Sequence, residues 1–94
     1  GFRIVPSTNL VDLNGVGQTY TVEENCMISI NVTYHSAKEH VDDHVSINGT
    51  TIIFNNIPIG YYNNSSSPIR CFKGDVIRIE TLTADSCIIR KVSN

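Results

Sequence analysis

The strongest constraint on the fold is a two-residue alternation of apolar and polar side chains over residues 26–34. Alternate positions carry Cys26, Ile28, Ile30, Val32 and Tyr34, and the positions between them carry Ser29, Asn31 and Thr33. Successive side chains of an extended strand point to opposite faces of a sheet, so this pattern predicts a strand with one buried face. No long window shows the apolar recurrence at three and four residues that a helix requires.

Turn signals predict further short strands. Asn48-Gly49 separates residues 45–47 from residues 50–54. This dipeptide tolerates the two consecutive positive φ angles of a type I′ turn, which predicts a hairpin. Two glycines in residues 14–17 indicate a loop or bulge between short strands at residues 2–5 and 19–22.

The last third of the sequence predicts a second hairpin. A tight-turn signal at residues 73–75 precedes residues 76–83, which are rich in β-branched side chains, and residues 84–86 reverse the chain into residues 87–92. Arg78, Glu80 and Arg90 are expected to form cross-strand charge pairs on its solvent-facing side.

These elements fit one domain over residues 1–94, an all-β antiparallel β-sandwich or jelly roll of about seven to eight short strands. A domain of this size has a thin core.

Charge and hydropathy exclude two classes of partner. The net charge is −2 and only seven Lys and Arg are scattered along the chain, so no basic footprint for nucleic acid or an anionic membrane is present. No apolar run approaches the roughly 20 residues that cross a bilayer, so membrane insertion is not expected.

The three cysteines, Cys26, Cys71 and Cys87, show no CxxC spacing. They predict neither a disulfide framework nor a zinc site. We expect free, buried thiols, which behave as small core hydrophobes and suit folding in a reducing cytoplasm.

The order of three motifs adds a resemblance. The run Gly17-Gln18-Thr19-Tyr20-Thr21-Val22-Glu23-Glu24-Asn25-Cys26 leads into the alternating strand; Val45-Ser46-Ile47-Asn48-Gly49 and Pro68-Ile69-Arg70-Cys71-Phe72-Lys73-Gly74-Asp75-Val76-Ile77 follow. From Gly17 onward the chain resembles the small jelly-roll heads, similar in architecture to tumour necrosis factor and complement C1q, that end bacteriophage tail fibres and related receptor-binding proteins. Cys26 stands where that pattern usually has glycine.

The resemblance implies a homotrimer whose loops touch a cell-surface glycan or protein, on a C-terminal fragment of a longer fibrous protein. It implies a location in the virion, after assembly in the host cytoplasm. Two alternatives remain open: a structural trimerisation or capping domain of a virion or surface protein, and a carbohydrate-binding module of a secreted enzyme.

Two clusters are candidate binding sites. Tyr61 and Tyr62 precede Asn63, Asn64 and Ser65, a mixture typical of saccharide sites because an aromatic ring stacks on sugar C–H groups while amides and hydroxyls bond sugar hydroxyls. The alternative is one buried tyrosine beside a flexible polar loop, since neighbouring strand residues face opposite sides.

The second cluster is rich in histidine. His35, His40 and His44 lie near Glu39, Asp42 and Asp43, which suggests a divalent metal site of imidazole and carboxylate ligands. The alternative is a solvated connecting loop, because no fixed spacing such as HExxH is present. No other cofactor is expected.

Catalysis is not expected. Cys or Ser with His lacks a recognisable local signature, and the paired carboxylates at residues 23–24 and 42–43 are adjacent, so an extended chain points them apart. Lys73-Gly74-Asp75 is interpreted as a hairpin turn rather than an integrin-type motif.

Overall fold

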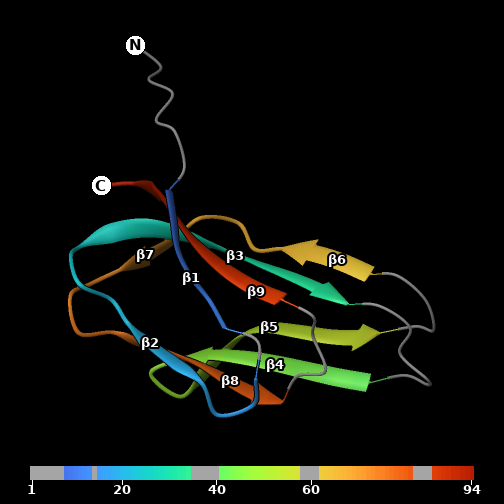
Figure 1. The fold of residues 1–94 in the computed structure, drawn as a ribbon. Helices are drawn as coiled ribbons and strands as arrows, with labels where there is room; N and C mark the ends of the chain where they lie inside the picture. The colour runs from blue at the N-terminus through green and yellow to red at the C-terminus, as the bar shows by residue number, and fades with distance from the viewer. Residues whose placement is uncertain (1–7, 14, 35–40, 58–61, 82–85) are drawn as a thin grey trace.

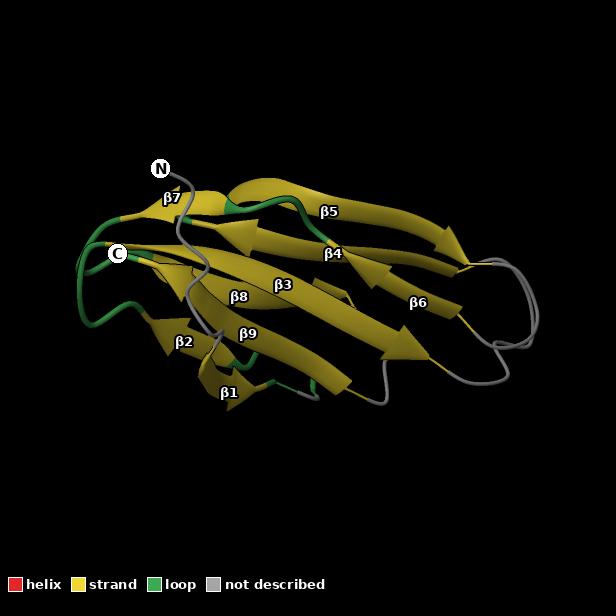
Figure 2. Cartoon of the chain, turned by 90° about the horizontal axis from the view of Figure 1, so that it is seen from above, coloured by secondary structure: helices red, strands yellow, loops and turns green. Residues whose placement is uncertain are grey.

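The chain forms two stacked antiparallel sheets (Figures 1 and 2). The computed structural model describes residues 8–13, 15–34, 41–57, 62–81 and 86–94, which contain strands and turns and no helix. Nine strands lie in these described residues: β1 (Thr8–Asp12), β2 (Thr19–Thr21), β3 (Cys26–Tyr34), β4 (Val41–Ile47), β5 (Thr50–Ile57), β6 (Tyr62–Ser65), β7 (Ile69–Cys71), β8 (Val76–Thr81) and β9 (Ser86–Ser93). The all-β sandwich expected from the sequence is confirmed. No helix in these residues is long and apolar enough to span a membrane.

The first sheet has the order β1-β9-β3, and both β6 and β7 pair with the far side of β3. β7 pairs with the beginning of β3 and β6 with its end. The second sheet has the order β2-β8-β4-β5. β1 and β2, although consecutive in the chain, are therefore edge strands of different sheets.

The alternation in β3 is confirmed by its burial. Ile28, Ile30 and Val32 are fully buried, whereas Asn31 and Thr33 on the other face are partly exposed. The buried face packs in a core that is shared by the two sheets and includes Leu13, Val22, Val45, Ile77, Ile79, Cys87 and Ile89. The thin core expected for a chain of this size lies between the sheets.

The Asn48-Gly49 turn adopts the predicted geometry. The φ angles are 51° at Asn48 and 84° at Gly49, and Ile47 pairs with Thr50 across the turn. Both central residues thus occupy the left-handed region that a type I′ turn requires.

The predicted hairpin of the last two strands is wrong. β8 lies in the second sheet and β9 in the first, so the chain crosses between layers after Thr81. Arg78 and Glu80 form an ion pair of 3.4 Å within β8, while Arg90 lies opposite Ser29 of β3 in the other sheet. A strand turns one face to the shared core whichever of the two sheets it belongs to. Local alternation of apolar and polar residues therefore does not decide which sheet the strand joins.

The first strand, β1, was not predicted from the sequence. The strand predicted at residues 2–5 falls outside the described residues. The two half-buried side chains of β1, Leu10 and Val11, are adjacent rather than alternate. A register shift between Asn9 and Val11 marks the irregularity that hides the two-residue period.

Candidate functional site

The polar run at residues 63–67, interpreted as a loop, is a strand over residues 63–65 and non-strand at residues 66–67. β6 pairs antiparallel with the end of β3, with Asn31 opposite Ser65 and Thr33 opposite Asn63. The loop interpretation is therefore wrong for residues 63–65: although Asn and Ser have low strand propensity, the neighbouring strand supplies partners for the backbone and the side chains.

Four side chains on the outer face of the first sheet form what we call the β3–β6 ladder: Asn31, Thr33, Asn63 and Ser65. Asn31 Nδ2 donates to Asn63 Oδ1 at 3.1 Å and to Ser65 Oγ at 2.5 Å. Asn63 Nδ2 donates to Thr33 Oγ1 at 3.1 Å, and Thr33 Oγ1 to Asn31 Oδ1 at 3.5 Å. Asn63 and Ser65 are exposed. The ladder is an uncharged, solvent-facing array of amides and hydroxyls.

Ser66 fastens the end of β6 to β3 in a different way. Its Oγ accepts from the backbone N–H of Ile30 and its carbonyl accepts from Ser29 Oγ, both at 2.9 Å. Its own N–H donates to the carbonyl of Ile30 at 2.8 Å. Ser66 thus holds the end of β6 against β3 through bonds that do not involve the ladder side chains.

Only part of the predicted saccharide site is described. Asn63 and Ser65 join the ladder, together with Asn31 and Thr33, which sequence reasoning did not assign to a site. Tyr61 lies outside the described residues. Tyr62 and Asn64 are placed by backbone register alone, opposite Tyr34 and Val32 of β3.

The histidine cluster is divided in the same way. His35 and His40 lie outside the described residues, whereas His44 sits half-buried in the middle of β4, opposite Phe54 of β5. Within the described ranges, no group of three or more metal-ligating side chains comes together. The metal site at His35, His40 and His44 remains a prediction.

The opposite end of the sandwich holds a second polar cluster, which we call the turn clamp: Asn25, Asn48 and Asp75. Asn48 Oδ1 accepts from the N–H of Val76 at 2.9 Å, and Asn48 Nδ2 donates to Asp75 Oδ1 at 3.0 Å. Asp75 Oδ2 accepts from the N–H of Phe72 at 2.8 Å. Asn25 Oδ1 accepts from the N–H of Lys73 at 2.9 Å. The clamp ties three turns together.

The carboxylate of the clamp is held in its charged form. The hydrogen bond from the Phe72 N–H, with a smaller contribution from Asn48, lowers the pKa of Asp75. Both carboxylate oxygens accept hydrogen bonds from groups of the same chain, which agrees with the interpretation of Lys73-Gly74-Asp75 as a structural turn.

The three cysteines are free and buried, as predicted. Burial, with a smaller contribution from Asp12, raises the pKa of Cys87 to about 12. Burial, with Asp75 and Cys26 nearby, raises the pKa of Cys71 to about 11. Both side chains are therefore neutral thiols near pH 7 and poor nucleophiles.

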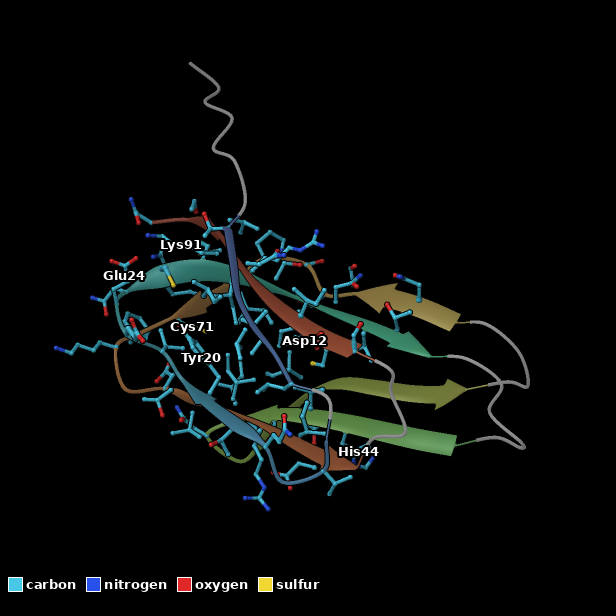
Figure 3. All side chains as sticks on the ribbon, in the orientation of Figure 1. Asp12, Tyr20, Glu24, His44, Cys71 and Lys91 are labelled. Atoms are coloured by element: carbon cyan, nitrogen blue, oxygen red, sulfur yellow. The ribbon has the colours of Figure 1, made fainter. Side chains whose placement is uncertain are left out.

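A cavity of about 290 Å³ opens between the edge strands β1 and β2. It is lined by Leu10, Tyr20, Val22, Glu23, Glu24, Cys26 and Lys91. Figure 3 shows Tyr20, Glu24 and Lys91 on this side of the molecule. The lining comes from four strands and a turn, so no local motif indicated the cavity.

The chain was also compared with protein-family models, with curated proteins and with solved structures. No match was found in any of the three comparisons.

Proposed function

We propose that this chain is a non-catalytic saccharide-binding domain of the receptor-binding type that ends bacteriophage tail fibres. The observation that carries the proposal is the β3–β6 ladder, in which four uncharged polar side chains share one outer face. A saccharide presents a row of hydroxyl groups that both donate and accept hydrogen bonds. Amides and hydroxyls are the protein groups that match such a row without carrying a charge.

The position of the ladder suits an extended ligand. Its members occupy two paired strands, whose opposed side chains lie about 5 Å apart. The ladder residues bond mainly to one another, so a bound sugar can exchange those bonds for its own with little cost to the backbone.

The thiol chemistry supports a non-catalytic role. The raised pKa values of Cys71 and Cys87 keep both sulfurs protonated and unreactive at neutral pH. Ser46 is buried and donates to Glu80 at 2.8 Å, an arrangement that stabilises the second sheet.

A glycan array probed with bacterial surface saccharides tests the proposal. We expect the wild-type chain to bind at least one saccharide and Asn63→Ala to lose about tenfold in affinity, the cost of one or two hydrogen bonds. Asn9→Ala is a matched control, since Asn9 is an exposed asparagine on β1, away from the ladder. Undiminished binding by Asn63→Ala would overturn the proposal.

The same proposal includes a homotrimer located in the virion. A protein interface would cover some of the exposed apolar side chains, since Val16, Ile52, Phe72 and Val76 are 37–64% exposed. Sedimentation equilibrium at micromolar concentration should give three times the mass of the chain, and a monomer would contradict this part. A trimer that leaves the array blank would instead indicate a structural capping domain.

A further inference from the structure

The cavity between β1 and β2 has an apolar wall. Val22 and Cys26 are 2% and 1% exposed, and Leu10 of β1 is half-buried beside them. Its volume of about 290 Å³ lies at the lower end of the range for small-molecule sites. Such a space suits a compact aliphatic body rather than a chain of sugars.

Charged side chains line the same cavity. Glu23 and Glu24 come from the turn between β2 and β3, and Lys91 comes from β9. Lys91 forms an ion pair with Glu24. Two carboxylates beside one ammonium leave the cavity with one net negative charge, which favours a cationic ligand over a neutral or anionic one.

Tyr20 connects the apolar wall to the charged groups. The pKa of Tyr20 is raised by burial first, and then by the nearby side chains of Glu23, Cys26 and Glu24. The phenol is therefore neutral at pH 7, and its ring supplies an aromatic surface near the two carboxylates. Aromatic rings next to carboxylates are favourable surroundings for an alkylammonium group.

We propose that this cavity binds a small primary amine with a compact aliphatic body. The ammonium group interacts with Glu23 and Glu24, in competition with Lys91, and the aliphatic body lies against Leu10, Val22 and Cys26. This site is separate from the β3–β6 ladder, because β1 and β6 lie on opposite sides of β3 in the first sheet. The two sites can therefore succeed or fail independently.

Three probes of one shape test the choice of ligand: cyclohexylamine, cyclohexanol and cyclohexanecarboxylate. In a 15N-resolved NMR titration of the full chain at pH 7 and low salt, cyclohexylamine should shift the amides of Tyr20, Val22 and Glu24. For a ligand of this size we expect a Kd of about 1 mM. Cyclohexanol should bind about threefold more weakly, as expected for loss of an exposed charge interaction, and cyclohexanecarboxylate more weakly still. Equal affinities for the three probes, or no saturable shifts with cyclohexylamine, would overturn the proposal.

Matched charge variants test the residues. Lys91→Met removes the competing ammonium, so cyclohexylamine should bind about threefold more tightly. Lys73→Met makes the same change in net charge on an exposed turn outside the cavity and should leave the affinity unchanged. Glu23→Gln should weaken binding about threefold.

Fold integrity is checked on the same samples, because dispersed amide spectra report it directly. Should Lys91→Met fail to fold, Lys91→Gln removes the charge and keeps a polar side chain. Equal affinities in the Lys91 and Lys73 variants would contradict the assignment of Lys91 as the competing group.

Discussion

The turn clamp and the β3–β6 ladder are both exposed, asparagine-rich clusters, but their side chains bond different partners. In the clamp, Asn48 and Asp75 accept from the backbone N–H groups of Val76 and Phe72. In the ladder, Asn31, Thr33, Asn63 and Ser65 bond one another. The clamp satisfies backbone donors that the fold needs, whereas the side chains of the ladder bond one another, and we propose that a ligand replaces those bonds.

The comparison predicts its largest effect at Asn48. Asn48→Ala removes the acceptor for the Val76 N–H. It also puts alanine at a φ of 51°, in the left-handed region that asparagine tolerates better because its polar side chain can form local hydrogen bonds. We expect the free energy of unfolding to fall by about 3 kcal/mol, from the lost hydrogen bonds and the left-handed backbone together. Urea unfolding measures this.

Asn48→Gly separates the two contributions. Glycine accepts the positive φ but provides no side-chain oxygen, so the loss should be about half that of Asn48→Ala. Equal losses in the two variants would show that the backbone conformation is not a significant part of the effect.

The core behind the ladder gives the next effect, at alkaline pH. Cys87 lies opposite Val32 of β3, and its pKa is raised from about 9 to about 12. The stabilisation of the folded chain that results from this pKa difference is fully present below pH 9. It is lost as the pH rises toward 12, because the Cys87 thiol releases its proton in that range only in the unfolded chain. This group should lower the free energy of unfolding by about 1.4 kcal/mol per pH unit there.

Urea midpoints at pH 8–10 for wild type and Cys87→Ala measure this dependence. The variant should show a shallower fall with pH, although its stability at pH 8 is lower because a buried side chain is truncated. An unchanged slope would mean that Cys87 titrates as freely in the folded chain as in the unfolded one.

A smaller effect is expected from Asp75 at acid pH. The fold lowers the pKa of Asp75 below its unfolded value of 3.8. The charged Asp75 therefore stabilises the folded chain above that pH, and this stabilisation is lost as the pH falls through the pKa of Asp75 in the folded chain. Asp75→Asn should flatten the fall in the urea midpoint between pH 5 and pH 3. If the urea midpoint fell equally with pH in both proteins, the hydrogen bonds of Asp75 would not stabilise the folded chain.

The smallest change in stability is expected in the ladder. Asn63→Ala removes its hydrogen bonds to the side chains of Asn31 and Thr33, which lie at the surface of the sheet, so the free energy of unfolding should change by less than about 0.5 kcal/mol. Differential scanning calorimetry with Asn9→Ala as the control checks this. A loss as large as that of Asn48→Ala would make the ladder a structural element.

The sequence predicted those elements whose determining residues lie within a few positions of one another. β3 and the Asn48-Gly49 turn were predicted because alternation and turn chemistry act within a few residues. β6 was missed because its polar residues find partners on a strand about thirty residues earlier. The separation of β8 from β9 depends on which layer each strand joins.

The candidate sites show the same limit. Asn63 and Ser65 were identified from composition, but Asn31 and Thr33 became candidates only through the register of β3 with β6. The cavity escaped prediction because Leu10, Tyr20 and Lys91 are distant in sequence and meet where the edges of two sheets approach each other.

The most direct test of the difference between the two clusters measures stability and saccharide affinity on the same three proteins. The saccharide is the best binder of the wild-type chain from the array, and affinity is measured by calorimetry at 10 °C, where all three proteins are checked to be folded. The prediction is that Asn63→Ala keeps the wild-type unfolding free energy and loses about tenfold in affinity, whereas Asn48→Ala loses about 3 kcal/mol of stability and keeps its affinity. The reverse pattern, a destabilised Asn63→Ala that still binds or a stable Asn48→Ala that does not, would contradict the account.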